Sequence, residues 1–278
     1  MAIGLFKKFL RLFKGKKQKK LGLALGSGGV KGLAHIGALR AFEEEGIHFD
    51  FVAGTSIGSI VGAMYACGYS SSGMIEYIKN LHLEDPLTLI KMKLTGVTPE
   101  KLLDQVFGGR DIEELSLPFC AVAVNVTSGE EVDITTGSVA TAVLASSAIP
   151  PMFKPVQIAD NRLIDGAFRN AVPANVVKNM GADCVIGISL GEEHPTNEVI
   201  KISLDELYKD NGVPICDRLT PFKIASDFLL TPSLSAYKST AISKMHEIYE
   251  IGYECAKRSM PEIKKVLKAK GIKLNKKS

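Results

Sequence analysis

A serine between two glycines is the first feature of this 278-residue chain that could do chemistry. The stretch VAGTSIGSIVGAMYACG, residues 52–68, places Ser56 between Gly54 and Gly58, after an apolar strand pattern and before a helical one. A Gly-x-Ser-x-Gly sequence at a strand-to-helix turn can expose the serine hydroxyl above a sheet, because the glycines leave room for a strained backbone. Ser56 is therefore a candidate nucleophile, although the repeated small residues also suit a helix packing face.

A glycine-rich loop, GSGGVKG at residues 26–32, precedes this turn. The loop does not match the dinucleotide pattern G-x-G-x-x-G, since Lys31 holds the last position, nor a P-loop, since no Gly-Lys-Ser/Thr follows. The N–H groups of Gly28 and Gly29 could instead form an oxyanion hole, in which one donor typically contributes about 2.7–4 kcal/mol. Lys31 could contact a substrate phosphate or remain a solvated lysine at a helix start. A generic phosphate-binding turn is the alternative for the loop.

The base that would activate Ser56 is not obvious from the five histidines. A Ser–Asp–His order leaves His194 and His246, and both occur in sequences typical of surface or packing histidines. Asp165 differs, because it ends a predicted strand and the following Gly166 lets the chain turn and leaves the carboxylate open. An aspartate in water has a pKa of about 3.9, but a desolvated pocket can raise that pKa enough for a Ser–Asp pair to work without an imidazole. A simple Asp-Gly turn is the alternative.

Short apolar runs and apolar residues at helical spacing predict the strands and helices that must position these residues. We predict strands at 21–25, 49–54, 119–126, 131–137 and 184–190, helices at 31–46, 57–68, 70–81, 98–107, 138–149 and 173–180, and a hairpin at 154–167 that turns at Asp160 and Asn161. Parallel strands with right-handed crossovers would place the glycine loop and the serine turn at the same edge of the sheet. The expected fold class is α/β, a three-layer sandwich with a mainly parallel central sheet flanked by helices.

The predicted organisation has three parts. Residues 1–20 form a cationic amphipathic segment, and residues 21–191 form the catalytic core. Residues 192–278 form an extension that we expect to pack on the core, with an irregular region to 234, a long helix at 235–259 and a basic tail.

Charge is distributed unevenly along the chain, whose formal net charge is +4. Residues 1–20 hold eight Lys or Arg and no acid, and residues 261–278 hold seven Lys and one Glu, which leaves 19 basic against 29 acidic residues between them. A nucleic-acid enzyme would carry its positive charge around its site, so we expect no nucleic-acid partner. The five cysteines include no CxxC pair, which argues against a zinc site or a disulfide framework and favours a reduced, cytoplasmic setting.

The N-terminal sequence MAIGLFKKFLRLFKGKKQKK is amphipathic when read as a helix. One half of the helical wheel holds Leu5, Phe6, Phe9, Leu10, Leu12 and Phe13, and the other half holds Lys7, Lys8, Arg11 and Lys14. The segment is too short to span a bilayer and too interrupted for a secretory signal. We expect residues 1–20 to lie on an anionic membrane surface, where each Lys or Arg adds roughly 1 kcal/mol. A solvated basic arm, or a helix docked on another domain, is the alternative.

The three motifs GSGGVKG, GTSIG and DGA, in this order, resemble the signatures of patatin-like phospholipases. ASSAIPPMFKPV, residues 145–156, resembles a further stretch typical of that family, and the resemblance runs from about residue 21 to 191. The chain departs from the family pattern at Ser27, where glycine is usual, and in DGA, where DGG is also common.

This resemblance implies a lipid acyl hydrolase with Ser56 as nucleophile, Asp165 as base, Gly28 and Gly29 as oxyanion donors, and neither metal nor cofactor. We therefore predict a phospholipase A- or lysophospholipase-like esterase that acts on phospholipid or another acyl-ester lipid. Its expected location is cytoplasmic, at the inner face of the membrane. The alternative, from another class, is a non-enzymatic membrane-associated module that binds a phosphate-containing ligand through the glycine loop.

Overall fold

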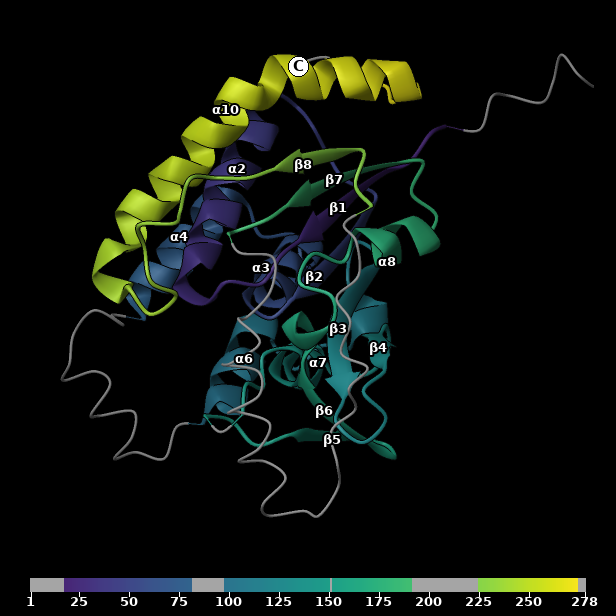
Figure 1. Cartoon of the computed structure of the whole chain (residues 1–278), viewed down its shortest axis with the longest axis vertical. Helices are drawn as coiled ribbons and strands as arrows, with labels where there is room; N and C mark the ends of the chain where they lie inside the picture. The colour runs from purple at the N-terminus through teal and green to yellow at the C-terminus, as the bar shows by residue number, and fades with distance from the viewer. Residues whose placement is uncertain (1–17, 82–97, 151, 192–224, 275–278) are drawn as a thin grey trace, which may run out of the picture.

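A central sheet lies between two layers of helices (Figure 1). The computed structural model describes residues 18–81, 98–150, 152–191 and 225–274. Within these ranges the sheet has eight strands in the order β5-β6-β3-β2-β1-β7-β8, and β4 pairs with β3 outside this path. The strands are β1 (Leu21–Leu25), β2 (Phe51–Thr55), β3 (Phe119–Asn125), β4 (Glu131–Ile134), β5 (Val156–Ile158), β6 (Asn161–Asp165), β7 (Cys184–Ile188) and β8 (Phe228–Leu230).

Helices cover both faces of the sheet, because the strands are apolar on both sides. Leu23 and Leu25 of β1 belong to the core beneath α2, α3 and α7, whereas Ala24 faces the opposite side, where α8 packs. The helices are α2 (Leu33–Glu44), α3 (Ile57–Ala66), α4 (Ser71–Asn80), α6 (Pro99–Phe107), α7 (Val139–Ser146), α8 (Ala174–Asn179) and α10 (Met245–Lys270), with a short 3-10 turn, η1 (Gly29–Gly32), before α2. The predicted three-layer α/β sandwich is confirmed, and its elements differ from the predicted ranges mainly at their ends.

The parallel part of the sheet comprises β3, β2, β1, β7 and β8. β4 and β6 both run antiparallel to β3 and lie on opposite sides of it. β6 therefore shares one edge of β3 with β2: Thr55, at the end of β2, is opposite Val122, and Asp165, at the end of β6, is opposite Ala123. The two strands run toward each other and end at neighbouring positions. This head-to-head arrangement brings the residues that follow β2 next to the last residue of β6.

The C-terminal helix differs most from its predicted range. α10 begins at Met245 and ends at Lys270, where Gly271 adopts a left-handed conformation, whereas the prediction was a helix at 235–259 followed by a basic tail. Pro261 lies inside the helix. A proline costs a helix interior about 3 kcal/mol, but buried side chains on both sides of Pro261, including Met260 and Ile263, offset this cost by packing on the core. β8 is a further difference, because it lies in the region predicted to be irregular and extends the parallel sheet beyond β7.

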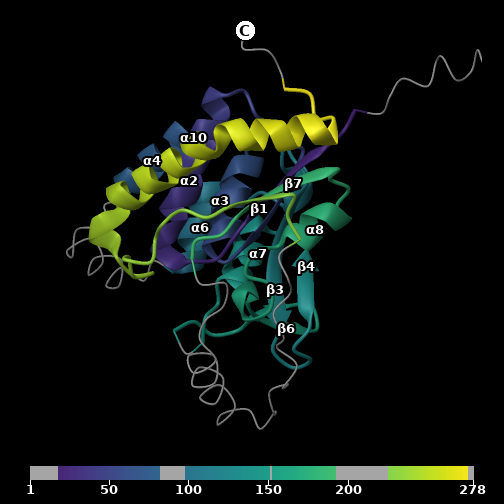
Figure 2. The same cartoon turned by 45° about the horizontal axis from the view of Figure 1, so that its top comes forward.

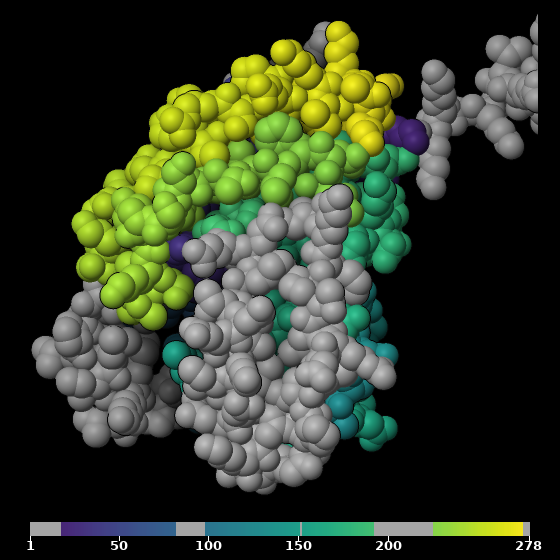
Figure 3. Space-filling view, in the orientation of Figure 1, coloured from purple at the N-terminus to yellow at the C-terminus, as the bar shows by residue number. Residues whose placement is uncertain are grey.

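α10 packs lengthwise on α2 and forms a continuous ridge along the molecule (Figures 2 and 3). The two helices approach closely, since a Cβ on Gly37 of α2 would overlap the Tyr249 carbonyl and a Cβ on Gly252 of α10 would overlap that of Ala34. No helix in the described part of the chain combines the length and apolarity needed to cross a bilayer.

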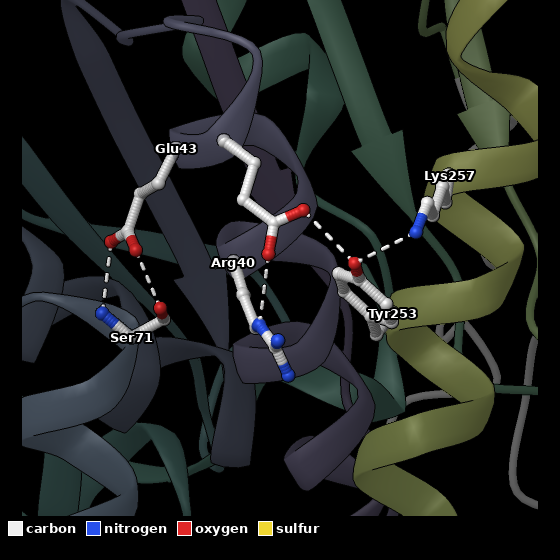
Figure 4. A network of polar contacts seen from close by, with 6 residues as sticks. Arg40, Glu43, Ser71, Tyr253 and Lys257 are labelled. Atoms are coloured by element: carbon white, nitrogen blue, oxygen red, sulfur yellow. Dashed lines mark hydrogen bonds and ion pairs between the residues drawn. The ribbon is translucent and has the colours of Figure 1, made fainter.

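Acidic residues at the end of α2 tie this helix to its two neighbours (Figure 4). Glu43 accepts a hydrogen bond from the Ser71 N–H of α4 at 2.8 Å. Glu44 accepts from Arg40 at 3.0 Å and from the Tyr253 hydroxyl of α10 at 2.9 Å, and Lys257 donates to the same hydroxyl. Because α2 directly follows the glycine loop, these contacts fix the helix on which that loop is mounted.

Candidate active site

Ser56 occupies a strained turn between β2 and α3, with φ 55° and ψ −126°. Such a conformation costs a non-glycine residue of order 1–3 kcal/mol and persists only where the surrounding structure enforces it. The two glycines of the motif allow the tight turn: a Cβ on Gly54 would overlap the Gly58 carbonyl, and a Cβ on Gly58 would overlap the Leu25 carbonyl. Ser56 is also 6% exposed and stands at the N-terminus of α3. These are the features typical of a nucleophile on a strand-to-helix turn.

Ser146, the last residue of α7, forms a hydrogen bond with the backbone of this turn. The Ser56 N–H donates to Ser146 Oγ at 2.9 Å, and Ser146 Oγ donates to the Val122 carbonyl of β3 at 2.6 Å. A second hydroxyl, Ser59 Oγ, donates to the Ser56 carbonyl at 2.6 Å. The backbone of Ser56 is thus hydrogen-bonded on both sides. The sequence contained Ser146 within the family-like stretch 145–156 but no spacing rule that linked it to Ser56.

Asp165 ends β6 with its side chain almost completely buried, 1% exposed. Its Oδ1 accepts a hydrogen bond from the Ala167 N–H at 2.8 Å, and its own N–H donates to the Ala148 carbonyl at 3.0 Å. Its other oxygen, Oδ2, is buried without a partner of good hydrogen-bond geometry among the described residues. Burial raises the pKa of Asp165 to about 6, while the nearby Ser56 side chain and the Ala167 N–H act in the opposite direction.

This pair of side chains has the properties needed for general base catalysis. A carboxylate with a pKa of about 6 is largely ionised at neutral pH and is a stronger base than an aspartate in water. Its unpaired oxygen leaves one acceptor position available. Because the Ser56 hydroxyl already influences the Asp165 carboxyl, a small movement could bring the two into a hydrogen bond, as catalytic contacts in ligand-free sites often require.

Two backbone donors of the glycine loop have no acceptor among the described residues. Gly28 has φ 156° and Gly29 has φ 57°. Four N–H groups of the loop have backbone acceptors: Gly26 bonds Ile188 at 3.0 Å, Ser27 bonds Ala171 at 2.9 Å, Val30 bonds Ser239 at 2.8 Å and Lys31 bonds Gly28 at 3.2 Å. The N–H groups of Gly28 and Gly29 have no acceptor among the residues that the structure describes. They are therefore the two groups of this loop that could bind an anionic oxygen.

The loop and the serine turn pack against each other. A Cβ on Gly32 would overlap the Ile57 side chain at the start of α3, and a Cβ on Gly58 would lie 2.7 Å from the Gly26 carbonyl oxygen. The Lys31 side chain extends toward Gly191, just beyond β7, and forms no ion pair with any described residue. A charged group is thus available beside the loop.

Of the two histidines considered as a base, the structure describes only His246. His246 is exposed on the first turn of α10, and His194 lies outside the described residues. His35, which has no predicted role, is fully buried and contacts the Gly26 carbonyl. In the sequence, the spacing of His35 among apolar residues predicts that it lies on the buried face of a helix. This spacing does not show whether the side chain only packs in the core or also contacts the glycine loop.

The comparison with known proteins identifies the family of the chain. The sequence profile described as patatin-like phospholipase matches residues 23–178, more than half of the chain. The chain belongs to the patatin-like phospholipase family. This assignment confirms the resemblance inferred from the motifs, all three of which lie within the matched residues.

Similar members of the family include much longer proteins. Patatin-like phospholipase domain-containing protein 6 of Mus musculus is 29% identical over 287 aligned residues, which cover 90% of this chain and 21% of that protein. An uncharacterized NTE family protein of Mycobacterium tuberculosis is 33% identical over 183 residues, 64% of this chain and 51% of that protein. This patatin-like chain therefore spans about a fifth of the length of its mammalian relative.

A solved structure shows the same fold. VipD from Legionella pneumophila superposes with a TM-score of 0.52 at 14% identity, covering 88% of this chain and 67% of that chain. At this identity the likeness establishes the architecture alone.

Proposed function

We propose that this patatin-like protein is a serine lipid acyl hydrolase with phospholipase A- or lysophospholipase-like activity. The observation that carries the proposal is the position of Ser56, on a strained turn beside the buried carboxyl of Asp165. The N–H groups of Gly28 and Gly29, which have no acceptor within the described part of the chain, support it, because ester hydrolysis passes through an anionic tetrahedral intermediate.

In the first half of the reaction, Ser56 Oγ attacks the ester carbonyl carbon and its proton moves to Asp165. The carbonyl oxygen becomes negatively charged and accepts hydrogen bonds from the N–H groups of Gly28 and Gly29. When this intermediate collapses, the bond from the carbonyl carbon to the lipid alcohol breaks, and the alcohol takes the proton from Asp165. An acyl-Ser56 ester and a free alcohol remain.

In the second half, water attacks the acyl-Ser56 carbonyl and gives a proton to Asp165. The second tetrahedral intermediate uses the same two N–H donors. Its collapse breaks the bond to Ser56 Oγ, which takes the proton back from Asp165. The fatty acid leaves and both side chains return to their starting states.

A membrane surface is the proposed location of the substrate. Ile149, Met152 and Phe153 are the large apolar side chains that stand exposed in the described residues, with Met152 at 72%. They follow Ala148, whose carbonyl accepts the Asp165 N–H, so this apolar turn lies beside the proposed base. We propose that it contacts lipid and that the basic segment 1–20 attaches the protein to the inner, anionic face of a membrane, although residues 1–17 lie outside the described residues.

The enzymatic proposal is tested with a fluorophosphonate probe, which forms a covalent bond with activated serines. We expect the folded full-length protein to be labelled, Ser56→Ala to lose all labelling and lipid hydrolysis, and Asp165→Asn to lose at least about 1,000-fold in rate. Ser72→Ala is the matched control, since Ser72 is exposed on α4. Folded wild-type protein that is neither labelled nor active would refute the proposal. Activity that survives in Asp165→Asn but disappears in His194→Ala or His246→Ala would replace the dyad by a histidine triad.

The attachment of residues 1–20 has a separate test. Lys19 and Lys20 pair with Asp183 and Asp50, so deletion of residues 2–17 removes most of the basic segment without breaking these ion pairs. We expect the deletion to weaken binding to phosphatidylglycerol vesicles at least about 10-fold. Unchanged binding would exclude this segment as the anchor.

A non-enzymatic function remains the second candidate, because Lys31 and the two backbone donors beside it have no partners in the ranges that the structure describes. Such a module would bind a phosphate group through the loop. Binding of phosphate-bearing lipid that is lost in Lys31→Ala, together with an unreactive Ser56, would favour this candidate. If the hydrolase is correct, Lys31→Ala should instead raise KM for phospholipid and leave KM for an uncharged ester unchanged.

A further inference from the structure

His35 stands directly behind the glycine loop, on the first turns of α2. Its side chain is completely buried, and Nε2 lies 2.7 Å from the carbonyl oxygen of Gly26. A carbonyl oxygen can only accept a hydrogen bond, so Nε2 carries the hydrogen and donates it. Among the described residues, this is the one side-chain hydrogen bond to the backbone of the loop. His35 takes no part in the proton transfers proposed above.

The second ring nitrogen shows that this histidine is neutral. Nδ1 is buried and has no hydrogen-bond partner among the residues that the structure describes. A protonated imidazole would place a second N–H there without an acceptor, which is costly in a buried site. Burial accordingly lowers the pKa of His35 to about 4, despite the hydrogen bond to Gly26. At neutral pH the ring is thus an uncharged donor with a single partner.

The carbonyl of Gly26, which accepts the hydrogen bond from His35, lies between the glycine loop and the serine turn. Gly26 is the first residue of the loop that carries the Gly28 and Gly29 donors. Its carbonyl oxygen also lies against Gly58, where an added Cβ would stand only 2.7 Å away. The Gly26 carbonyl is therefore held between the His35 ring and the first turn of α3, the helix that directly follows Ser56. A displacement of this carbonyl would change the distance between the loop donors and the serine.

A loop of this composition needs such an anchor. Glycines have more conformational freedom than other residues, and Gly28 and Gly29 both have positive φ. The N–H bonds of Gly26, Ser27 and Val30 fix the loop from the donor side. The hydrogen bond from His35 Nε2 to the Gly26 carbonyl adds a bond in which the loop is the acceptor, and its donor is a rigid ring on α2.

We propose that His35 is a positioning residue, which holds the Gly26 carbonyl so that the N–H groups of Gly28 and Gly29 stay directed at the oxygen that becomes charged. This inference rests on the proposed hydrolase function. The N–H groups of Gly28 and Gly29 bind the charged oxygen of the transition state more strongly than the carbonyl oxygen of the bound substrate. Loss of the His35 bond should therefore lower kcat and leave KM nearly unchanged.

The test compares side chains that differ in whether they can donate to Gly26. His35→Gln places an amide N–H near the position of Nε2, His35→Asn carries the same group on a shorter side chain that does not reach, and His35→Leu has no donor. With full-length protein and p-nitrophenyl butyrate, we expect kcat to fall about 10- to 100-fold in His35→Leu and His35→Asn, with KM within about 2-fold. His35→Gln should recover most of the rate. Rates are expressed per active site, counted by titration with the fluorophosphonate, so that unfolded protein does not contribute.

The outcomes separate this inference from the proposed function. An inactive, unlabelled wild type refutes the hydrolase itself. An active wild type with equal kcat in His35→Gln and His35→Asn, or a change confined to KM, refutes only the positioning role. Nitrogen-15 NMR of the histidine ring provides a measurement independent of activity: we expect a neutral ring with hydrogen on Nε2 from pH 5 to 8, and a ring that titrates near pH 6.5 would overturn the inference.

Discussion

The carboxyl group of Asp165 has a pKa of about 6, because burial disfavours its ionised form more than the Ser56 side chain and the Ala167 N–H favour it. The same shift makes the group a better base and lowers the stability of the fold. Between pH 4 and pH 6, roughly, the folded chain binds more protons at this residue than the unfolded chain does. The free energy of unfolding therefore falls as the pH rises through this window. A site residue that opposes stability in this way is typical of catalytic groups.

Replacement of Asp165 by asparagine should stabilise the protein at alkaline pH. The asparagine amide has nearly the same shape, can accept from the Ala167 N–H and never ionises. We expect the free energy of unfolding at pH 8 to increase by up to about 3 kcal/mol and the increase to vanish near pH 3, where the wild-type carboxyl is mostly protonated in both states. Urea unfolding at the two pH values measures this difference. Asp160→Asn, at the exposed turn of the β5–β6 hairpin, is the control and should show no comparable gain.

The rate should depend on the same ionisation. Protonated Asp165 cannot accept the Ser56 proton, so kcat/KM for a soluble ester should rise with pH, reach half its maximum near pH 6 and then level off. A pH–rate profile from pH 4.5 to 8.5 measures this. A rate that stays constant across pH 6 would contradict the assignment of Asp165 as base.

At the scale of elements, the site depends on strands that meet end to end. β2 and β6 run in opposite directions along the same edge of β3, and they end opposite Val122 and Ala123. α7 crosses beneath this junction, where Ser146 joins the Ser56 N–H to β3. The serine turn is therefore held by a strand and a helix that come from later in the chain.

Two neighbouring serines at the end of α7 give a matched test of this support. Ser146→Ala leaves the Ser56 N–H without its acceptor, which should lower the free energy of unfolding by about 1–3 kcal/mol and reduce the labelling rate of Ser56. Ser147→Ala should change neither by much, because Ser147 Oγ is buried without a partner among the described residues. Thermal unfolding and fluorophosphonate labelling kinetics measure the two effects. Equal behaviour of the two variants would remove Ser146 from the support of the turn.

At the scale of the whole molecule, basic charge is separated along the sequence from the acidic central part of the chain. The basic residues concentrate at the two ends of the chain, and seven of them follow residue 260. Part of this C-terminal group lies on α10, where Lys264 and Lys270 pair with Glu45 and Asp227. Lys19 and Lys20 of the N-terminal segment are paired in the same way. The N-terminal segment remains the stronger candidate for binding an anionic surface because its sequence combines basic residues with an apolar half.

The exposed turn beside Asp165 should matter only when the substrate is in a membrane. The double variant Met152→Ser/Phe153→Ser removes most of its apolar surface. We expect turnover of phosphatidylglycerol in vesicles to fall at least about 10-fold, because each buried methylene contributes about 0.8 kcal/mol to insertion. Hydrolysis of p-nitrophenyl butyrate should stay within about 2-fold of the wild type. A parallel loss on both substrates would indicate damage to the site rather than loss of membrane contact.

Much of the fold follows from local patterns in the sequence. β1 is predicted at its observed bounds and α3 within two residues of its end, because burial on both faces and helical spacing are recorded in adjacent residues. α10 was misplaced, because the packing of Met260 and Ile263 on the core, which allows a proline in the helix, is not a local property. The hairpin was predicted, but its turn lies at Ala159 and Asp160, one residue earlier than expected.

The sequence by itself determined the family and the choice of candidate site residues, since Ser56, Asp165, Gly28 and Gly29 belong to motifs whose order and spacing are readable along the chain. Only the tertiary structure decided how they are supported. The antiparallel run of β6 toward β2, the bond from Val30 to Ser239 and the buried contact of His35 join residues far apart in sequence or depend on burial. The pKa of Asp165 has the same origin, because desolvation is set by everything that surrounds a side chain and not by its neighbours in the sequence.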